Sequence, residues 1–412
     1  MKSVAWICVD FGAGSGGHRT VFQNFNYLAK HGYKCDLYVI DAKEPEEELK
    51  ARIAKDYFDL NGGIYTGKTL RKKYDMIIAT YYETVECVVK MEAEKKVYFI
   101  QDYEPWFFPM SENYLMARKS YQYGLNGISI GKWLAKKIQE SFKMKMSYFD
   151  FGADLQTYCK LDNSEKEDAI CFIYQPDKPR RCVDMGLRAL QIVQSVRPET
   201  KIYLYGSQKM IPFNIRAEHL GVITVEECNR LYNKCRVGLC LSASNPSRVP
   251  FEMMAAGLPV VDMYLENNLY DFPEQGCLLA EPSAEAIAGA ILKLLNNEKM
   301  QRKMSVDGAK YMMDFPLEKG FEEFKKAIDD CFERKCIKRE QLKKIYKGQP
   351  ITWTGSKFKI KQKVYFKSEE EIEAERLELE REEARKKEEE WRNNLTVPQK
   401  VFLKIRYILK GY

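Results

Sequence analysis

The sequence predicts an α/β protein made of two successive doubly wound parallel sheets that face each other across a cleft, followed by a charged helical tail. Short apolar runs alternate with helical patterns, which is typical of parallel sheets. This alternation stops at a polar stretch over 160–168 and then restarts. At 412 residues the chain is also long enough for two such units.

The first unit is predicted over 1–158. It opens with an apolar run at 4–9, a glycine-rich turn at 10–17 and a helical pattern at 18–30. Further strands are predicted at 34–40, 75–79, 96–100 and 127–130, and helices at 83–93, 112–123 and 131–142. The segment 41–73 is ambiguous.

The second unit is predicted over 166–315. Thr224 and Glu227 form a capping-box pattern for a helix at 225–235, and Pro250 opens a helix that ends at Gly257. The other predicted strands lie at 169–174, 201–205, 236–241, 258–262 and 276–280, and the other helices at 183–195 and from Ser283. A helix within 316–345 is expected to pack back on the first unit. Ligands of such sheets bind at the carboxyl ends of the strands, so the cleft is the expected site.

Composition narrows the class of protein. The formal charge of +7 is too small to indicate nucleic-acid binding and suits an acidic ligand or a membrane surface. The twelve cysteines are scattered, which predicts reduced thiols. The first residues resemble a strand and not a signal peptide, and no apolar run approaches the roughly 18 residues of a membrane span. We therefore expect a cytoplasmic protein, free or peripheral on the inner face of the membrane.

The tail, over 346–412, differs from both units. Residues 368–394 are mostly Glu, Lys and Arg, which predicts a solvated helix or a coiled-coil partner. Val397–Tyr412 instead has an apolar helical face flanked by basic residues. This segment is a candidate for lying on an anionic membrane or docking on its own globular body.

Three segments are candidates for binding a charged ligand. A glycine-rich loop that includes Gly16 and Gly17 follows the first strand and opens a helix, and helix N-termini favour anions. Arg180 and Arg181 follow the first strand of the second unit, where guanidinium groups suit a diphosphate. Glu252 lies in the first turn of a later helix, where a carboxylate can hold sugar hydroxyls.

The segment from Ser242 to Val261 resembles the donor-binding motif of GT-B glycosyltransferases of family 4. The longer pattern is similar to the WsaF-type rhamnosyltransferase branch over about residues 3–325. The resemblance is carried by Gly16-Gly17-His18, Gln101-Asp102-Tyr103-Glu104-Pro105, Gly152-Ala153-Asp154, Pro179-Arg180-Arg181, Pro246-Ser247 and Pro250-Phe251-Glu252-Met253. It implies a GT-B fold and a nucleotide-sugar substrate.

The resemblance also implies roles for single residues. On the donor side, Gly16, Gly17, Arg180, Arg181, Ser244, Ser247 and Glu252 would bind the nucleotide sugar. Arg181 would neutralise the leaving diphosphate, and Glu252 would hold the ribose. On the acceptor side, His18, Gln101 and Glu104 would contact substrate, and Asp102 would orient or deprotonate the acceptor hydroxyl. Ser244 stands where the family usually has a second Glu.

These observations predict a hexosyltransferase, retaining by resemblance, that builds a cell-surface polysaccharide, with dTDP-L-rhamnose as the candidate donor and a glycan or lipid-linked saccharide as acceptor. No metal-ligand spacing is legible, so neither metal nor cofactor is expected. Two alternatives stay open: a nucleotide-sugar epimerase of GT-B fold, and a non-catalytic scaffold with a degenerate site.

Overall fold

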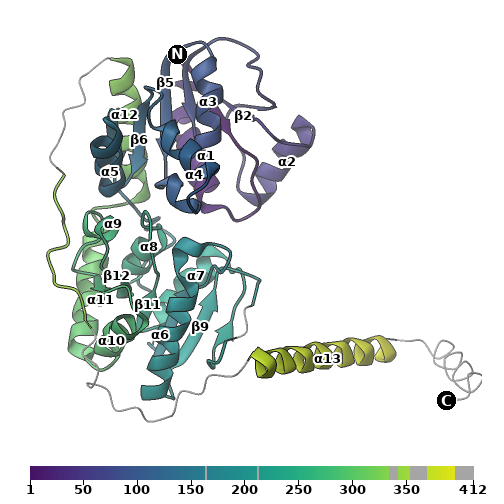
Figure 1. Ribbon diagram of the computed structural model, residues 1–412, viewed down its shortest axis with the longest axis vertical. Coiled ribbons are helices and arrows are strands. Elements are labelled where there is room, and N and C mark those ends of the chain that lie inside the picture. Colours follow the sequence, from purple (N-terminus) through teal and green to yellow (C-terminus); the bar gives the residue numbers. More distant parts are fainter. Residues whose placement is uncertain (163–164, 211–212, 334–341, 353–368, 395–412) are drawn as a thin grey trace, which may run out of the picture.

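The computed structural model describes residues 1–412 except 163–164, 211–212, 334–341, 353–368 and 395–412. It contains one parallel sheet in each half of the chain, and this confirms the predicted α/β class. Figure 1 shows the two halves stacked along the long axis of the molecule. We call them the N-terminal unit and the C-terminal unit.

The N-terminal unit is built on a seven-stranded sheet with the order β3-β2-β1-β4-β5-β6-β7. The strands are β1 Lys2–Cys8, β2 Tyr33–Val39, β3 Gly63–Thr66, β4 Tyr74–Ala79, β5 Ala93–Ile100, β6 Asn126–Ile130 and β7 Met146–Phe149. The helices are α1 Gly16–Lys30, α2 Glu46–Asp56, α3 Tyr82–Lys90, α4 Glu112–Ser120 and α5 Lys132–Phe142, with the 3-10 helix η1 Glu104–Phe107.

The C-terminal unit has a six-stranded sheet with the order β10-β9-β8-β11-β12-β13. The strands are β8 Ala169–Ile173, β9 Lys201–Tyr205, β10 Glu218–His219, β11 Val237–Leu239, β12 Val260–Met263 and β13 Cys277–Ala280. The helices are α6 Val183–Val196, α7 Val225–Lys234, α8 Val249–Ala255, α9 Glu266–Leu269, α10 Ala284–Leu295 and α11 Glu298–Met312, with the 3-10 helix η2 Pro179–Arg181.

Helix α12, Leu317–Phe332, follows the C-terminal unit in sequence but packs on the N-terminal unit, against β7, α1 and β6 (Figure 1). Its Phe324 lies under the sheet, with its ring centroid 5.1 Å from that of Phe99 and 5.7 Å from those of Trp6 and Phe149. Burial of this aromatic cluster fixes the helix to the first sheet, because each ring removes a large apolar area from water.

Two elements lie in the segment 41–73, which the sequence left ambiguous. Helix α2 buries only Leu49 and Ile53, so its apolar stripe is too thin to be read from the pattern. Strand β3 has four residues on the sheet edge. Strands β7 and β10 and helices α9 and α11 were also not predicted.

The start of the predicted tail belongs to the C-terminal unit. Ile351 forms a parallel bridge with Ala280 of β13, and its N–H donates to the carbonyl of Leu279 at 2.9 Å. Tyr346 is buried, and its hydroxyl accepts a hydrogen bond from the N–H of Leu279. The tail prediction over 346–412 was therefore wrong for these first residues, because a buried tyrosine and one strand-like contact leave no periodic signal.

The charged segment forms helix α13, Glu369–Asn393. Every α13 residue whose exposure the structure describes is exposed, which agrees with a solvated helix. The basic amphipathic segment Val397–Tyr412 lies outside the described residues. No helix in the described part of the chain is long and apolar enough to cross a membrane.

Candidate functional site

Each sheet reverses its strand order at one point, between β1 and β4 in the N-terminal unit and between β8 and β11 in the C-terminal unit. Ligands of doubly wound sheets bind outside the carboxyl ends of the strands at such a point. The loops that leave these four strands all line one cavity of about 710 Å³ between the two units. The topology therefore places a binding site there independently of any motif.

The glycine loop forms one wall of this cavity. Ser15 caps α1, since its side chain accepts a hydrogen bond from the N–H of His18. Gly16 and Gly17 line the cavity, and a Cβ atom at Gly17 would lie 3.5 Å from Nε2 of Gln101. The first turn of α1 therefore presents its backbone to the cavity, as an anion-binding helix N-terminus does.

His18 lies in the same wall but is held away from a charged role. Its Nδ1 is 2.9 Å from Oγ of Ser15, and its ring stacks at 4.7 Å on Phe11. Burial lowers the pKa of His18 to about 4, so the imidazole is neutral at pH 7. His18 can contact a substrate there as a neutral hydrogen-bonding group.

Three cations follow β8 on the opposite wall. Nη1 of Arg181 donates to Oγ of Ser242 at 3.1 Å, and Arg180 lies 4.3 Å from the centroid of the Phe107 ring. Lys178 lines the same wall, and burial together with Arg180 and Arg181 lowers its pKa to about 8. Three like charges gathered in a partly buried wall repel one another, so the arrangement favours a multiply charged anion.

Glu252 lies in the first turn of α8 and lines the cavity, as does Ser247 in the loop before it. Oγ of Ser247 accepts a hydrogen bond from the N–H of Val249 at 3.1 Å, which shapes the start of α8. Burial raises the pKa of Glu252 to about 7, although Arg248 opposes the shift. A carboxyl group in this state can both donate and accept hydrogen bonds with sugar hydroxyls.

Ser244 is not among the residues that line the cavity, in contrast to the donor-side role predicted for it. It is buried, and its hydroxyl donates to Oδ2 of Asp102 at 2.9 Å. A serine side chain is too short to reach past this partner. The backbone of β5 ends just before Asp102, which brings the carboxylate across the interface toward the loop after β11.

Asp102 has most of its hydrogen-bonding capacity in use. Oδ1 accepts hydrogen bonds from the N–H groups of Tyr103 and Asn245, at 2.8 and 2.9 Å, and Oδ2 lies 3.4 Å from Nε of Arg180. Burial raises the pKa of Asp102, and Arg180 opposes the shift. These contacts make Asp102 a link between the two units. Its predicted action on an acceptor hydroxyl stays a prediction.

The two remaining acceptor-side residues lie in the cavity wall beside Asp102. The carbonyl of Gln101 accepts a hydrogen bond from Nδ2 of Asn245 at 2.9 Å, which leaves its side chain toward Gly17. Oε2 of Glu104 accepts a hydrogen bond from the N–H of Tyr82 at 2.7 Å. Burial raises the pKa of Glu104 to about 8, so this carboxyl group is mostly protonated at neutral pH.

The sequence analysis missed several residues of the cavity wall. Their signal is weak, since each is a single polar residue in a loop or on a helix: Arg19, Asp154, Tyr158, Lys178 and Arg248. For Lys178 the usable clue was its position two residues before the predicted arginine pair. The spacing of Arg248 from Glu252, one helical turn, was a clue to the second of these positions.

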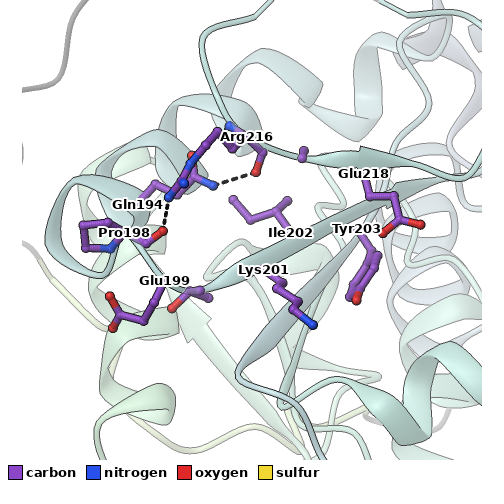
Figure 2. Close-up of a pocket in the computed structure, with 10 residues that line it drawn as sticks. Gln194, Pro198, Glu199, Lys201, Ile202, Tyr203, Arg216 and Glu218 are labelled. Atoms are coloured by element: carbon purple, nitrogen blue, oxygen red, sulfur yellow. Dashed lines mark hydrogen bonds between the residues drawn. The ribbon is translucent and has the colours of Figure 1, made fainter.

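A second cavity, of about 530 Å³, lies at the amino-terminal end of β9, as Figure 2 shows. Arg216 and Gln194 hold its upper rim: the N–H of Arg216 donates to Oε1 of Gln194 at 2.9 Å, and Nε2 of Gln194 donates to the carbonyl of Arg216 at 2.6 Å. Because the strands are parallel, this cavity lies at the opposite end of the sheet from the cleft.

Two family models match adjacent parts of the chain. The WsaF N-terminal domain matches residues 69–132, and the WsaF C-terminal domain matches residues 168–292. The chain is also 24% identical over 327 residues to the O-antigen biosynthesis protein RfbC of Myxococcus xanthus. That match covers 75% of this chain but only 25% of RfbC, so the chain spans about a quarter of its relative's length.

Solved structures of similar fold include TarM of S. aureus, in complex with fondaparinux, alpha-GlcNAc-glycerol and UDP, at a TM-score of 0.65 and 9% identity. The match covers 81% of this chain and all of TarM. Anabaena Alr3699/HepE, in complex with UDP-glucose, has a TM-score of 0.61 and 13% identity, covering 80% of this chain and all of HepE. WaaG, a glycosyltransferase involved in lipopolysaccharide biosynthesis, has a TM-score of 0.57 and 12% identity, covering 79% of this chain and 99% of WaaG.

Two Rossmann-ordered sheets with a shared cavity at their switch points define the GT-B class, in agreement with these neighbours. Within that class, the two matched domains lie in the same order as in the chain. The chain belongs to the WsaF type of GT-B glycosyltransferases.

Proposed function

We propose that this chain transfers a sugar from a nucleoside diphosphate to a saccharide acceptor bound in the cleft, as a step in the synthesis of a cell-surface polysaccharide. The observation that carries the proposal is the cavity wall formed by Lys178, Arg180 and Arg181, which faces the first turn of α1 across the space between the units. A diphosphate needs such a set of donors, and its charge grows as it leaves the sugar.

In this proposal the residues divide by chemistry. Lys178, Arg180 and Arg181 stabilise the leaving diphosphate, and Ser242 keeps Arg181 in place through its hydroxyl. Glu252 holds the ribose hydroxyls. Gly16 and Gly17 let the donor approach the backbone of α1, and His18, Gln101 and Glu104 form the acceptor wall. The cations take the role that a metal ion has in other transferases, so we propose metal-independent transfer with no cofactor.

The finer assignment is L-rhamnose from dTDP-L-rhamnose, with retention of configuration and a glycan or lipid-linked acceptor. It is supported by the WsaF family match. The RfbC match supports a role in O-antigen or a related polysaccharide. We also propose that Val397–Tyr412 attaches the protein peripherally to the inner face of the membrane; deleting it should abolish sedimentation with anionic vesicles.

A thermal-shift screen against UDP-, GDP- and dTDP-sugars tests the donor class, because a ligand that binds only the native state raises its unfolding temperature. The donor found in this way is then incubated with and without saccharide acceptors, and the products are analysed. Transfer only when acceptor is present supports the proposal. Isomerised nucleotide sugar without acceptor would indicate an epimerase, and no binding of any nucleoside diphosphate would indicate a scaffold.

Glu252→Gln is the sharpest variant for this test. It keeps the shape of the side chain but removes an oxygen acceptor from the ribose site. We expect the donor affinity to fall about tenfold or more, which corresponds to about 1.4 kcal/mol or more. Arg188→Gln is the matched control, since Arg188 is an exposed residue of α6 that does not line the cavity.

A further inference from the structure

The cavity contains a second group of cations, separate from the three that follow β8. Arg19 lies on α1 of the N-terminal unit, and Arg248 immediately precedes α8 of the C-terminal unit. Both line the cavity, and they are close enough for Arg19 to lower the pKa of Arg248, after burial has lowered it further. This pair therefore spans the cleft.

Arg248 is only partly satisfied by the protein. Its Nη1 donates to Oε1 of Gln23, on α1, at 2.8 Å. Its Nε is buried and has no hydrogen-bond partner in the part of the chain that the structure describes. A buried guanidinium donor without an acceptor costs free energy, and buried polar groups are almost always paired. The arrangement is that of a donor waiting for a ligand.

The carboxylates nearby do not neutralise this pair. Glu252 lies one helical turn from Arg248, but burial raises its pKa to about 7, so it carries only part of a charge at neutral pH. Asp154 is turned toward its own loop, where Oδ2 accepts a hydrogen bond from Oγ1 of Thr157 at 2.7 Å. Arg19 and Arg248 therefore leave net positive charge in the cavity beyond what Lys178, Arg180 and Arg181 provide.

A nucleoside diphosphate has one pyrophosphate, and the three cations after β8 suffice to bind it. We propose that Arg19 and Arg248 bind a second oxyanion, a phosphate or carboxylate group carried by the acceptor. The proposal rests on the proposed transferase function. The acceptor is favoured over the donor because Arg19 and the Gln23 that positions Arg248 both come from the N-terminal unit, across the cavity from the diphosphate wall.

The first test uses inorganic phosphate as the probe. Calorimetric titration of phosphate into the full chain saturated with its nucleoside diphosphate should show binding, because the second site stays open. Arg248→Met and Arg19→Met should each weaken that binding at least tenfold while the nucleotide affinity changes less than threefold. Arg248→Lys, which keeps a charge, should bind phosphate with intermediate affinity, and Arg188→Met should behave as the wild type.

Phosphate is also titrated into the nucleotide-free chain and into Arg180→Met. We expect Arg180→Met to keep the Arg248-dependent phosphate site and Arg248→Met to lose it. If no nucleotide binds the wild type, the proposed function fails, while this comparison still decides the second site. If Arg248→Met binds phosphate as tightly as the wild type in both titrations, the second site is refuted.

Kinetics identify the source of the oxyanion. Matched neutral, phosphate-bearing and carboxylate-bearing saccharide acceptors are compared. Arg248→Met should raise KM for the acceptor at least tenfold with whichever anionic acceptor is preferred, and leave KM for the neutral acceptor unchanged. A rise in KM for the donor with all acceptors would overturn the proposal, because the arginine would then serve the nucleotide. Circular dichroism and Arg248→Lys rule out misfolding as the cause.

Discussion

The hydroxyl of Ser244 donates a 2.9 Å hydrogen bond to the carboxylate of Asp102, and this bond joins the C-terminal unit to the N-terminal unit. Position 244 is where related glycosyltransferases usually carry a glutamate. Here a glutamate would place a second carboxylate directly against a buried aspartate. The serine and Asp102 are therefore a matched pair, and the interface depends on both.

Changing Ser244 should affect stability more than chemistry. Ser244→Ala removes one buried hydrogen bond and should lower the free energy of unfolding by about 1 kcal/mol. Ser244→Glu adds an unpaired buried charge and should lower it by about 3 kcal/mol or more. Urea denaturation measures both. A Ser244→Glu variant that is as stable as the wild type and transfers faster would show that the side chain turns into the cavity.

Removing a cation from the diphosphate wall should slow transfer. Arg181→Gln should reduce kcat by about 100-fold, because the leaving group loses a positioned charge-assisted donor. Steady-state kinetics at saturating donor measures the change. Arg216→Ala is the comparison: Arg216 lines the distant cavity of Figure 2, and its loss should leave kcat within about twofold. Equal losses in both variants would point to general destabilisation.

Transfer should persist when divalent metal ions are removed. The charge on the leaving diphosphate is met by Lys178, Arg180 and Arg181 in the proposed mechanism. Initial rates measured after exhaustive dialysis against EDTA should therefore stay within about twofold of the untreated enzyme. A loss of activity that Mg²⁺ or Mn²⁺ restores would show that the cations do not suffice.

Glu104 should make stability depend on pH. Burial raises its pKa from 4.5 to about 8 in the folded chain. The folded state then holds a proton that the unfolded state has lost between about pH 4.5 and 8, so the stability from this group is complete below pH 4.5 and declines as pH rises through 8. Glu104→Gln cannot lose a proton.

The comparison of wild type with Glu104→Gln isolates this effect from other titrating groups, such as His18, whose pKa shift acts in the opposite direction. The free energy of unfolding of the variant, minus that of the wild type, should increase between pH 5.5 and pH 8.5. Chemical denaturation at both values gives the difference. A difference that stays constant with pH would mean that Glu104 titrates normally.

Much of the fold was legible in the sequence because buried parallel strands are continuous apolar runs. The run at 169–174 and the Thr224–Glu227 capping box both correspond to observed elements, β8 and α7. Short edge elements such as β10 were missed, since two residues give no period. Helix boundaries at caps were predicted better, as Ser283 at the start of α10 shows.

The site was predictable where residues follow strands in the sequence, as Gly17 and Arg181 do. It was not predictable where side chains meet across the two units. Ser244 and Asp102 are 142 positions apart, and their contact depends on how the two sheets face each other. The same is true of Arg248 and Gln23, which are 225 positions apart. Pattern in a single sequence carries no information about such pairs.

The chain crosses between the two units twice, and the crossings are hydrogen-bonded to each other. The N–H of Ala153 donates to the carbonyl of Phe315, and the N–H of Leu317 donates to the carbonyl of Ala153. A side chain at Gly152 would collide with the carbonyl of Pro316, at 2.8 Å from its Cβ, so the crossings lie in direct contact. They form a double-stranded hinge: separating the units means pivoting about this seam and breaking the Ser244–Asp102 and Arg248–Gln23 bonds.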